Sequence, residues 1–228
     1  MPAPNNVSKI VLARVHNGRT EFVEWIRDAD VVWIVADGHE TIIGPDEWEQ
    51  SSADLTARGF VEVYPNDQRK MEADKDRVLN LVRNAFRGVV LGDGVGLRQG
   101  QGLDDYADEH TLAAYRALDE KENWSAISVS DLDRCYSSLS FFDADGMRFH
   151  LPAYLIADLE ERLQTAEILF HLIHFAHGAE SRFETLSPIQ RECVRQFLLF
   201  RLSDHHRDFA HSLIEAALRD YWTVERNS

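Results

Sequence analysis

Disulfide bonds, membrane spans and a secretory leader are what this sequence lacks. It has two cysteines, Cys135 and Cys193, and no CxxC pair, so it offers no framework of disulfide bridges and fits reduced, buried thiols. No apolar run approaches the roughly 20 residues that span a bilayer. The start, MPAPNNVSK, has no charged leader followed by an apolar core. These absences predict a cytoplasmic protein without a membrane partner.

Basic residues are also scarce. The chain has 24 Lys and Arg against 39 Asp and Glu, which gives a net charge of −15, and it has no run of five basic residues. Proteins bind a nucleic-acid backbone through cations that neutralise its phosphates, so this charge argues against a DNA or RNA partner. The same charge suits a protein that covers a basic surface of another protein.

The composition is that of a globular protein, since 44% of the 228 residues are hydrophobic and 28% are charged. Runs rich in β-branched and aromatic residues, separated by helical segments, predict a small α/β unit over residues 1–70. Its expected strands are 7–15, 30–36 and 60–64, and its expected helices are 20–27 and 46–58. A polar connector, PNDQRKMEADKD, follows this unit.

Residues 75–228 predict a helix-rich domain that contains one β-hairpin. With the small α/β unit before it, the expected fold class of the chain is α+β. The hairpin is expected in SSLSFFDADGMRFHL, where two β-rich runs flank a turn at Asp143–Gly146. Ser187, Pro188 and Gln190 form a helix start signal: an N-cap, a proline at the first helical position and a reciprocal capping residue. Helices are expected to end at Phe86 and to run over 103–121, 152–177, 188–202 and 204–222.

The stretch GVVLGDGVGLRQGQG, residues 88–102, holds six of the twelve glycines. A dinucleotide-binding loop needs a third glycine after either glycine pair, and Leu97 and Gln99 stand at those two positions. A P-loop needs a lysine, which is missing here, and Asp93 stands where a phosphate would approach. The stretch is therefore interpreted as a turn and a helix start in which glycine supplies backbone freedom.

Three segments carry a resemblance to a known family. They are FRGVVLGDGVGLRQGQGLDDYAD, YSSLSFFDADGMRFHLPAYL and LSPIQRECVRQFLLF. Together they resemble a bacterial family known only as a domain of unknown function, over roughly residues 80–202. The resemblance implies a domain boundary near residue 75, and it implies no activity and no catalytic residue. Residues 1–70 show no such resemblance.

Histidines and carboxylates in the C-terminal half are candidate metal ligands. Glu167 and His171 share a polar stripe on the expected helix 152–177, and Asp208 and His211 share one on the last expected helix. Spacings of three and four residues aim side chains at one point, as metal sites in helical bundles require. If the two stripes face each other, these four residues could hold Zn²⁺, Mn²⁺ or iron. The open alternative is that each stripe is a solvated helix face.

Arg148 and His150 are candidate binding residues. In the expected second strand of the hairpin they alternate with Met147, Phe149 and Leu151, so they would share the face opposite the apolar one. On that face they could bind an anion or a carboxylate of a partner. The open alternative is a plain exposed strand face.

Two functional hypotheses follow from the sequence. The first is a non-catalytic, acidic binding protein with a basic protein partner and no cofactor, of which an immunity-type protein is one example. The second is a metal-dependent, hydrolase-like enzyme that uses a divalent metal held by Glu167, His171, Asp208 and His211. The sequence leaves the oligomeric state open.

Overall fold

The structure, a computed structural model, describes residues 8–16, 19–28, 31–36, 39–43, 47–62, 68–202 and 210–223. The chain divides into two compact units, one of residues 75–197 and one of residues 1–74 together with 198–228. One boundary falls inside helix α2 (Gln68–Ala85) and the other inside helix α8 (Pro188–Leu202). The domain limits expected from the sequence, 1–70 and 75–228, stay a prediction.

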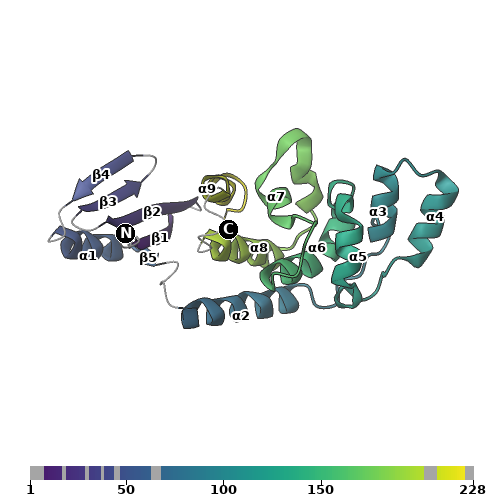
Figure 1. Ribbon diagram of the computed structural model, residues 1–228, viewed down its shortest axis with the longest axis horizontal. Coiled ribbons are helices and arrows are strands. Elements are labelled where there is room, and N and C mark those ends of the chain that lie inside the picture. Colours follow the sequence, from purple (N-terminus) through teal and green to yellow (C-terminus); the bar gives the residue numbers. More distant parts are fainter. Residues whose placement is uncertain are drawn as a thin grey trace, which may run out of the picture. The chain divides into compact units, whose positions relative to one another are not determined.

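The first unit contains an antiparallel sheet with the strand order β4-β3-β2-β1-β5 (Figure 1). The strands are β1 (Ser8–His16), β2 (Arg19–Asp28), β3 (Val31–Ala36), β4 (His39–Ile43) and β5 (Val61–Glu62), and helix α1 (Trp48–Ala57) precedes β5. Leu12 on β1 lies opposite Val23 on β2. Val23, Leu55 and Phe60 are buried together, and Leu12 packs against them.

The helix expected over residues 20–27 is wrong, because these residues form most of strand β2. The segment contains Phe22, Val23, Trp25 and Ile26, side chains that suit a pleated and half-buried surface. β1 and β3 pair with β2 on its two sides, so both of its edges are hydrogen-bonded. Helix α9 (His211–Asp220) packs against β2 in the same unit.

The second unit is built around helix α6 (Ala144–Leu159), of whose 16 residues 12 are buried. A helix buried on nearly all sides belongs to the interior of a helical fold. The other helical elements are α2 (Gln68–Ala85), α3 (Leu97–Asp104), α4 (Glu109–Leu118), η2 (Trp124–Ala126), α5 (Val129–Arg134), η3 (Tyr136–Ser140), α7 (Ile168–Ile173) and η4 (Ala176–Phe183). Elements η2, α5, α7 and η4 pack against α6.

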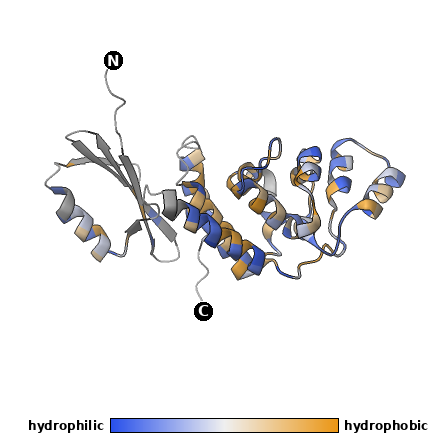
Figure 2. Ribbon diagram, turned by 60° about the horizontal axis from the view of Figure 1, so that its bottom comes forward, coloured by the Kyte–Doolittle hydropathy of each residue, from blue (hydrophilic) through white to orange (hydrophobic). Residues whose placement is uncertain are grey.

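Hydrophobic and hydrophilic residues alternate along most of these helices (Figure 2). This pattern is expected of helices that bury one face and expose the other. No helix in the described parts of the chain is long and apolar enough to cross a membrane.

The expected β-hairpin is wrong, and with it the α+β class assigned from the sequence: residues 68–202, all described, contain helices and no strand. The DADG segment starts helix α6 instead of forming a hairpin turn. The Asp143 carboxylate accepts a hydrogen bond from the Gly146 backbone N–H at 2.8 Å, as an N-cap residue does. Its Oδ1 also accepts one from the Val95 N–H at 2.9 Å. Pro152, expected in a first helical turn, lies inside α6.

Two long helices expected from periodicity are each interrupted at a residue with a left-handed backbone. Between α3 and α4, Tyr106 has φ 55° and the Ala107 N–H donates to the Gly102 carbonyl at 2.9 Å. After α6, Glu161 has φ 56° and the Arg162 N–H donates to the Ala157 carbonyl at 2.9 Å. Both are helix-ending turns, in which the chain reverses through one left-handed residue.

The start of helix α8 is confirmed at Pro188. The Ser187 backbone N–H donates to the Gln190 side-chain oxygen at 3.0 Å, and the Gln190 N–H donates to the Ser187 hydroxyl at 3.4 Å. This is the reciprocal capping pair that the sequence predicts.

The glycine-rich stretch forms a turn followed by helix α3. Gly92 adopts φ 55°, and a Cβ on Gly94 would lie 2.5 Å from the Gly146 nitrogen. The Asp119 carboxylate accepts hydrogen bonds from the backbone N–H groups of Arg98, at 2.7 Å, and Gln99, at 3.2 Å. A carboxylate of the chain itself therefore occupies the helix N-terminus at which a phosphate would bind.

Candidate functional site

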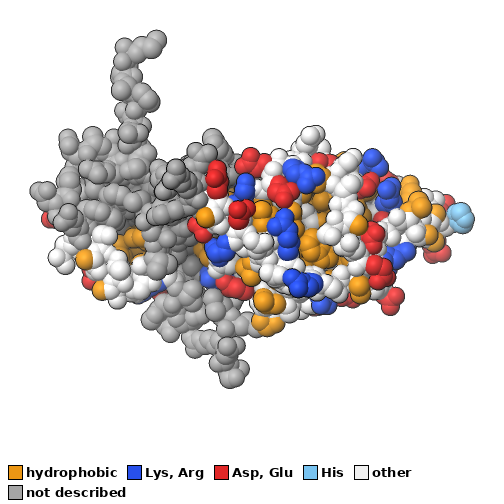
Figure 3. All heavy atoms as spheres, turned by 90° about the horizontal axis from the view of Figure 1, so that it is seen from below, with side chains coloured by type: hydrophobic (Ala, Val, Ile, Leu, Met, Phe, Trp, Pro, Cys, Tyr) orange, Lys and Arg blue, Asp and Glu red, His pale blue; other side chains and the backbone are white. Residues whose placement is uncertain are grey.

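The helix-rich unit contains a pocket of about 610 Å³ between α2, η2, α5 and α6. Pockets of this size are typical of sites for small organic ligands. Seen from below, basic side chains lie beside hydrophobic ones on the surface of the helix-rich unit (Figure 3).

The floor of the pocket is apolar. It is lined by Trp124, Ile127, Val129, Leu132, Ala153, Ile156 and Ala157. Trp124 is fixed because its indole Nε1 donates a hydrogen bond to the Phe86 carbonyl at 2.8 Å. Its position is therefore set by the end of α2, and the ring forms one wall of the pocket.

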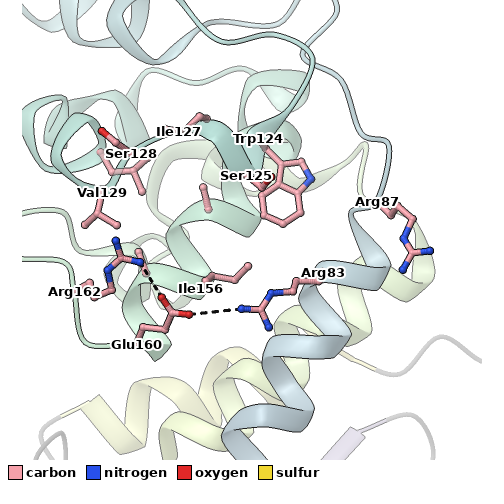
Figure 4. A pocket seen from close by; sticks show the side chains of 13 residues that line it. Arg83, Arg87, Trp124, Ser125, Ile127, Ser128, Val129, Ile156, Glu160 and Arg162 are labelled. Carbon is pink, nitrogen blue, oxygen red and sulfur yellow. Dashed lines mark hydrogen bonds and ion pairs between the residues drawn. The ribbon is translucent and has the colours of Figure 1, made fainter.

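The rim of the pocket is cationic: Arg83, Arg87 and Arg162 line it together with one acid, Glu160. Glu160 lies between two of these arginines (Figure 4). Its Oε2 is 3.0 Å from Nη1 of Arg162, and its Oε1 is 3.6 Å from Nη2 of Arg83. The side chains of Arg83 and Arg162 are 49% and 59% exposed, so solutes in water reach both guanidinium groups.

Helix ends place these charges. Arg83 lies in the last turn of α2, where a cation complements the partial negative charge of the helix C-terminus. Glu160 is the C-cap residue of α6, where a carboxylate meets that same partial negative charge unfavourably. The left-handed Glu161 then reverses the chain, and Arg162 returns to within ion-pair distance of Glu160. Two cations thus hold an acid at a position that the helix itself disfavours.

The chemistry of the lining is that of anion binding. A planar guanidinium presents paired donors to a carboxylate or phosphate, and three guanidinium groups outnumber one carboxylate here. The hydroxyls of Ser125 and Ser128 are engaged by neighbours: Ser125 donates to the Asn123 side chain at 2.7 Å and Ser128 to Asp131 at 2.8 Å. The residues that line this pocket include no His, Cys, Asp, Lys or Tyr.

Two of the four metal-ligand candidates lie at helix α7. Glu167 is the residue before its first turn, and His171 lies within it, so the two do not share the long helix on which their stripe was predicted. His171 Nδ1 is 3.5 Å from Nη1 of Arg182. Burial, together with the charges of Arg182 and His174, lowers the pKa of His171 to about 4. The imidazole of His171 is therefore neutral beside the guanidinium of Arg182.

The other two candidates belong to the second polar stripe. Asp208 lies outside the described residues. His211 is the first residue of α9 and is 5% exposed. Within the residues that the structure describes, no group of three or more His, Cys, Asp and Glu side chains is arranged to hold a metal ion.

Arg148 and His150 lie on helix α6 and not on a strand. His150 is fully buried, its Nδ1 is 2.7 Å from the Gly146 carbonyl oxygen, and its ring stacks on Phe142 at 4.3 Å. Burial lowers the pKa of His150 to about 4. His150 is therefore a neutral residue of the core, and Arg148 is half-buried.

Sequence reasoning did not find the pocket. Two of its arginines, at positions 83 and 87, lie close together in the sequence, and the third, at position 162, lies far from both. Its apolar residues have the spacing of ordinary core positions. The only local signal is that Arg83 and Arg87 lie one helical turn apart near the end of a helix.

The part of the chain that contains the pocket matches a known protein family. Residues 74–226 match a family of unknown function, DUF6714. The chain belongs to this family. The match confirms the resemblance seen over residues 80–202 and leaves the N-terminal sheet unmatched. No curated protein and no solved structure matches the chain. All residues that line the pocket lie within the DUF6714 match.

Proposed function

We propose that the DUF6714 domain of this chain is a non-catalytic binding domain whose pocket takes an anionic group attached to an apolar body. The observation that carries the proposal is the rim of three arginines above an apolar floor. An amphipathic carboxylate matches both parts, because its charged end pairs with guanidinium groups while its tail leaves water. This proposal keeps the expectation of a non-catalytic binding protein, but its ligand is an anion in place of the basic protein partner expected from the net charge.

The lining supports binding without catalysis. General acid–base catalysis needs a titratable group near neutral pH, and nucleophilic catalysis needs an activated hydroxyl, thiol, amine, imidazole or carboxylate. The single carboxylate of the lining, Glu160, is paired with two arginines, and both serine hydroxyls are engaged in side-chain hydrogen bonds. Among the described residues, the two histidines whose pKa values are strongly lowered, His150 and His171, do not line the pocket.

Calorimetric titration of the full chain with octanoate tests the proposal. Octanol and octylammonium have the same tail with a neutral or a cationic head. We expect octanoate to bind and the other two to bind at least about tenfold more weakly, since one charge-assisted hydrogen bond is worth roughly 1.4 kcal/mol or more. Octanol binding as tightly as octanoate, or no binding of octanoate, would rule the proposal out.

A matched pair of variants locates the site. Arg162→Gln removes a guanidinium that lines the pocket, and we expect octanoate affinity to fall about tenfold. Arg134→Gln is the control: Arg134 pairs with Asp131 at 3.1 Å and is 63% exposed, close to the values for Arg162, but it does not line the pocket. Equal losses in the two variants would show that the ligand binds elsewhere.

A further inference from the structure

We infer that Glu160 is an internal competitor for the anion position of the pocket, so that a ligand carboxylate binds by displacing it from Arg83 and Arg162. The inference rests on the proposed function. Glu160 is the one carboxylate among the lining residues, and each of its oxygens faces a different guanidinium. Its position is therefore the position that an incoming carboxylate would take.

The geometry allows this exchange. The Glu160 side chain is 30% exposed, and its partners Arg83 and Arg162 are more exposed still. The contact to Arg83 is long, at 3.6 Å, so that arginine has donors left for a second acceptor. Exposed ion pairs of this kind are held by small free energies and exchange their partners readily.

The competition also defines the ligand class. An anion without an apolar part would form the same ion pairs with Arg83 and Arg162 that Glu160 already forms. Its binding would therefore give no net gain in free energy over the contact with Glu160. An anion with an apolar tail gains in addition the burial of that tail against Trp124 and Ile156. The pocket therefore selects amphipathic carboxylates and rejects small anions such as acetate.

Glu160→Gln tests the inference because it removes the competing charge and keeps the size of the side chain. We expect the variant to bind octanoate about tenfold more tightly than the natural chain does, as one unit charge is removed from beside the ligand. Glu161→Gln is the control, since it removes the same charge one residue away from the lining, and its octanoate affinity should change less than about twofold.

The outcomes separate the two proposals. If the natural chain binds octanoate and Glu160→Gln binds it equally or more weakly, the competition is wrong and the binding function stands. If neither protein binds octanoate, the binding function itself is wrong. Should Glu160→Gln fail to fold, nuclear magnetic resonance of the arginine side-chain N–H groups in the natural chain decides. Octanoate must then shift the signals of Arg83 and Arg162 and leave that of Arg134 in place, and unshifted Arg83 and Arg162 signals overturn the inference.

Discussion

The backbones of Gly94 and Gly146 lie in direct contact, so that a Cβ on Gly94 would be 2.5 Å from the Gly146 nitrogen. A Cβ on Gly146 would likewise be 2.5 Å from the Val95 carbonyl oxygen. The glycine-rich turn therefore packs on the first turn of α6 without an intervening side chain. Glycine at these two positions is required by the close approach of the two backbone segments.

Gly94→Ala should destabilise the protein by about 3 kcal/mol, because a methyl group must force two backbone segments apart. Gly88→Ala is the comparison: Gly88 has φ 73° with open space around it, so alanine there should cost only about 1 kcal/mol of backbone strain. Urea denaturation followed by far-UV circular dichroism measures both. Equal costs would contradict the close approach.

Asp143→Ala should cost about 2 kcal/mol, because the Gly146 and Val95 N–H groups both lose their acceptor. Asp145→Ala removes the same charge from the first turn of α6 and should cost about 0.5 kcal/mol through the helix dipole alone. If this segment formed a hairpin turn, the two substitutions should lower the stability by similar amounts. Denaturation midpoints of the two variants distinguish these cases.

Tyr106→Gly should stabilise the protein by about 1 kcal/mol, because glycine adopts the left-handed backbone at this position without steric cost. Tyr106 is 95% exposed, so the substitution loses no packing. Tyr106→Ala keeps the strain and should bring no gain. A lower thermal midpoint for Tyr106→Gly than for the natural chain would contradict the assignment of Tyr106 to a strained turn.

Stability should fall as the pH is lowered from about 6.5 to about 4. The pKa of His150 is lowered from 6.5 to about 4 by burial, so the folded protein binds its proton less readily than the unfolded chain does. Its contribution is present in full above pH 6.5 and is lost as the unfolded state takes up the proton. Over this interval the loss amounts to about 3 kcal/mol.

His150→Leu should flatten this part of the pH profile, measured by urea denaturation at pH 7 and pH 5. His171, whose pKa is lowered in the same direction, should contribute to the slope that remains in His150→Leu. An unchanged slope in His150→Leu would show that His150 does not set it.

Local signals in the sequence were sufficient where one interpretation was available. The capping pair Ser187 and Gln190 predicts the start of α8 because its residue types at that spacing suit only a helix start. The DADG segment was ambiguous, since an aspartate followed by a glycine suits a hairpin turn and a helix N-cap equally. The helix is favoured by the hydrogen bond that Asp143 accepts from the Val95 N–H, which comes from a segment 48 residues away.

The polar stripe of Glu167 and His171 was predicted wrongly, and the pocket was not predicted, for a related reason. The stripe required a continuous helix through Glu160, and periodicity alone does not reveal a left-handed residue such as Glu161 that carries a side chain. The pocket joins the ends of α2 and α6, and which ends meet is a property of the tertiary fold. Arg83 and Glu160 are 77 positions apart in the sequence, and no local pattern relates them.

The position of Trp124 gives the pocket its own optical reporter. The chain has five tryptophans, and Trp124 is the only one between residues 75 and 197. Its indole is anchored on the Phe86 carbonyl and lines the pocket. A molecule that enters there replaces water beside this ring, so its arrival changes the emission of one known fluorophore. Candidate ligands can therefore be screened with the unlabelled, natural chain.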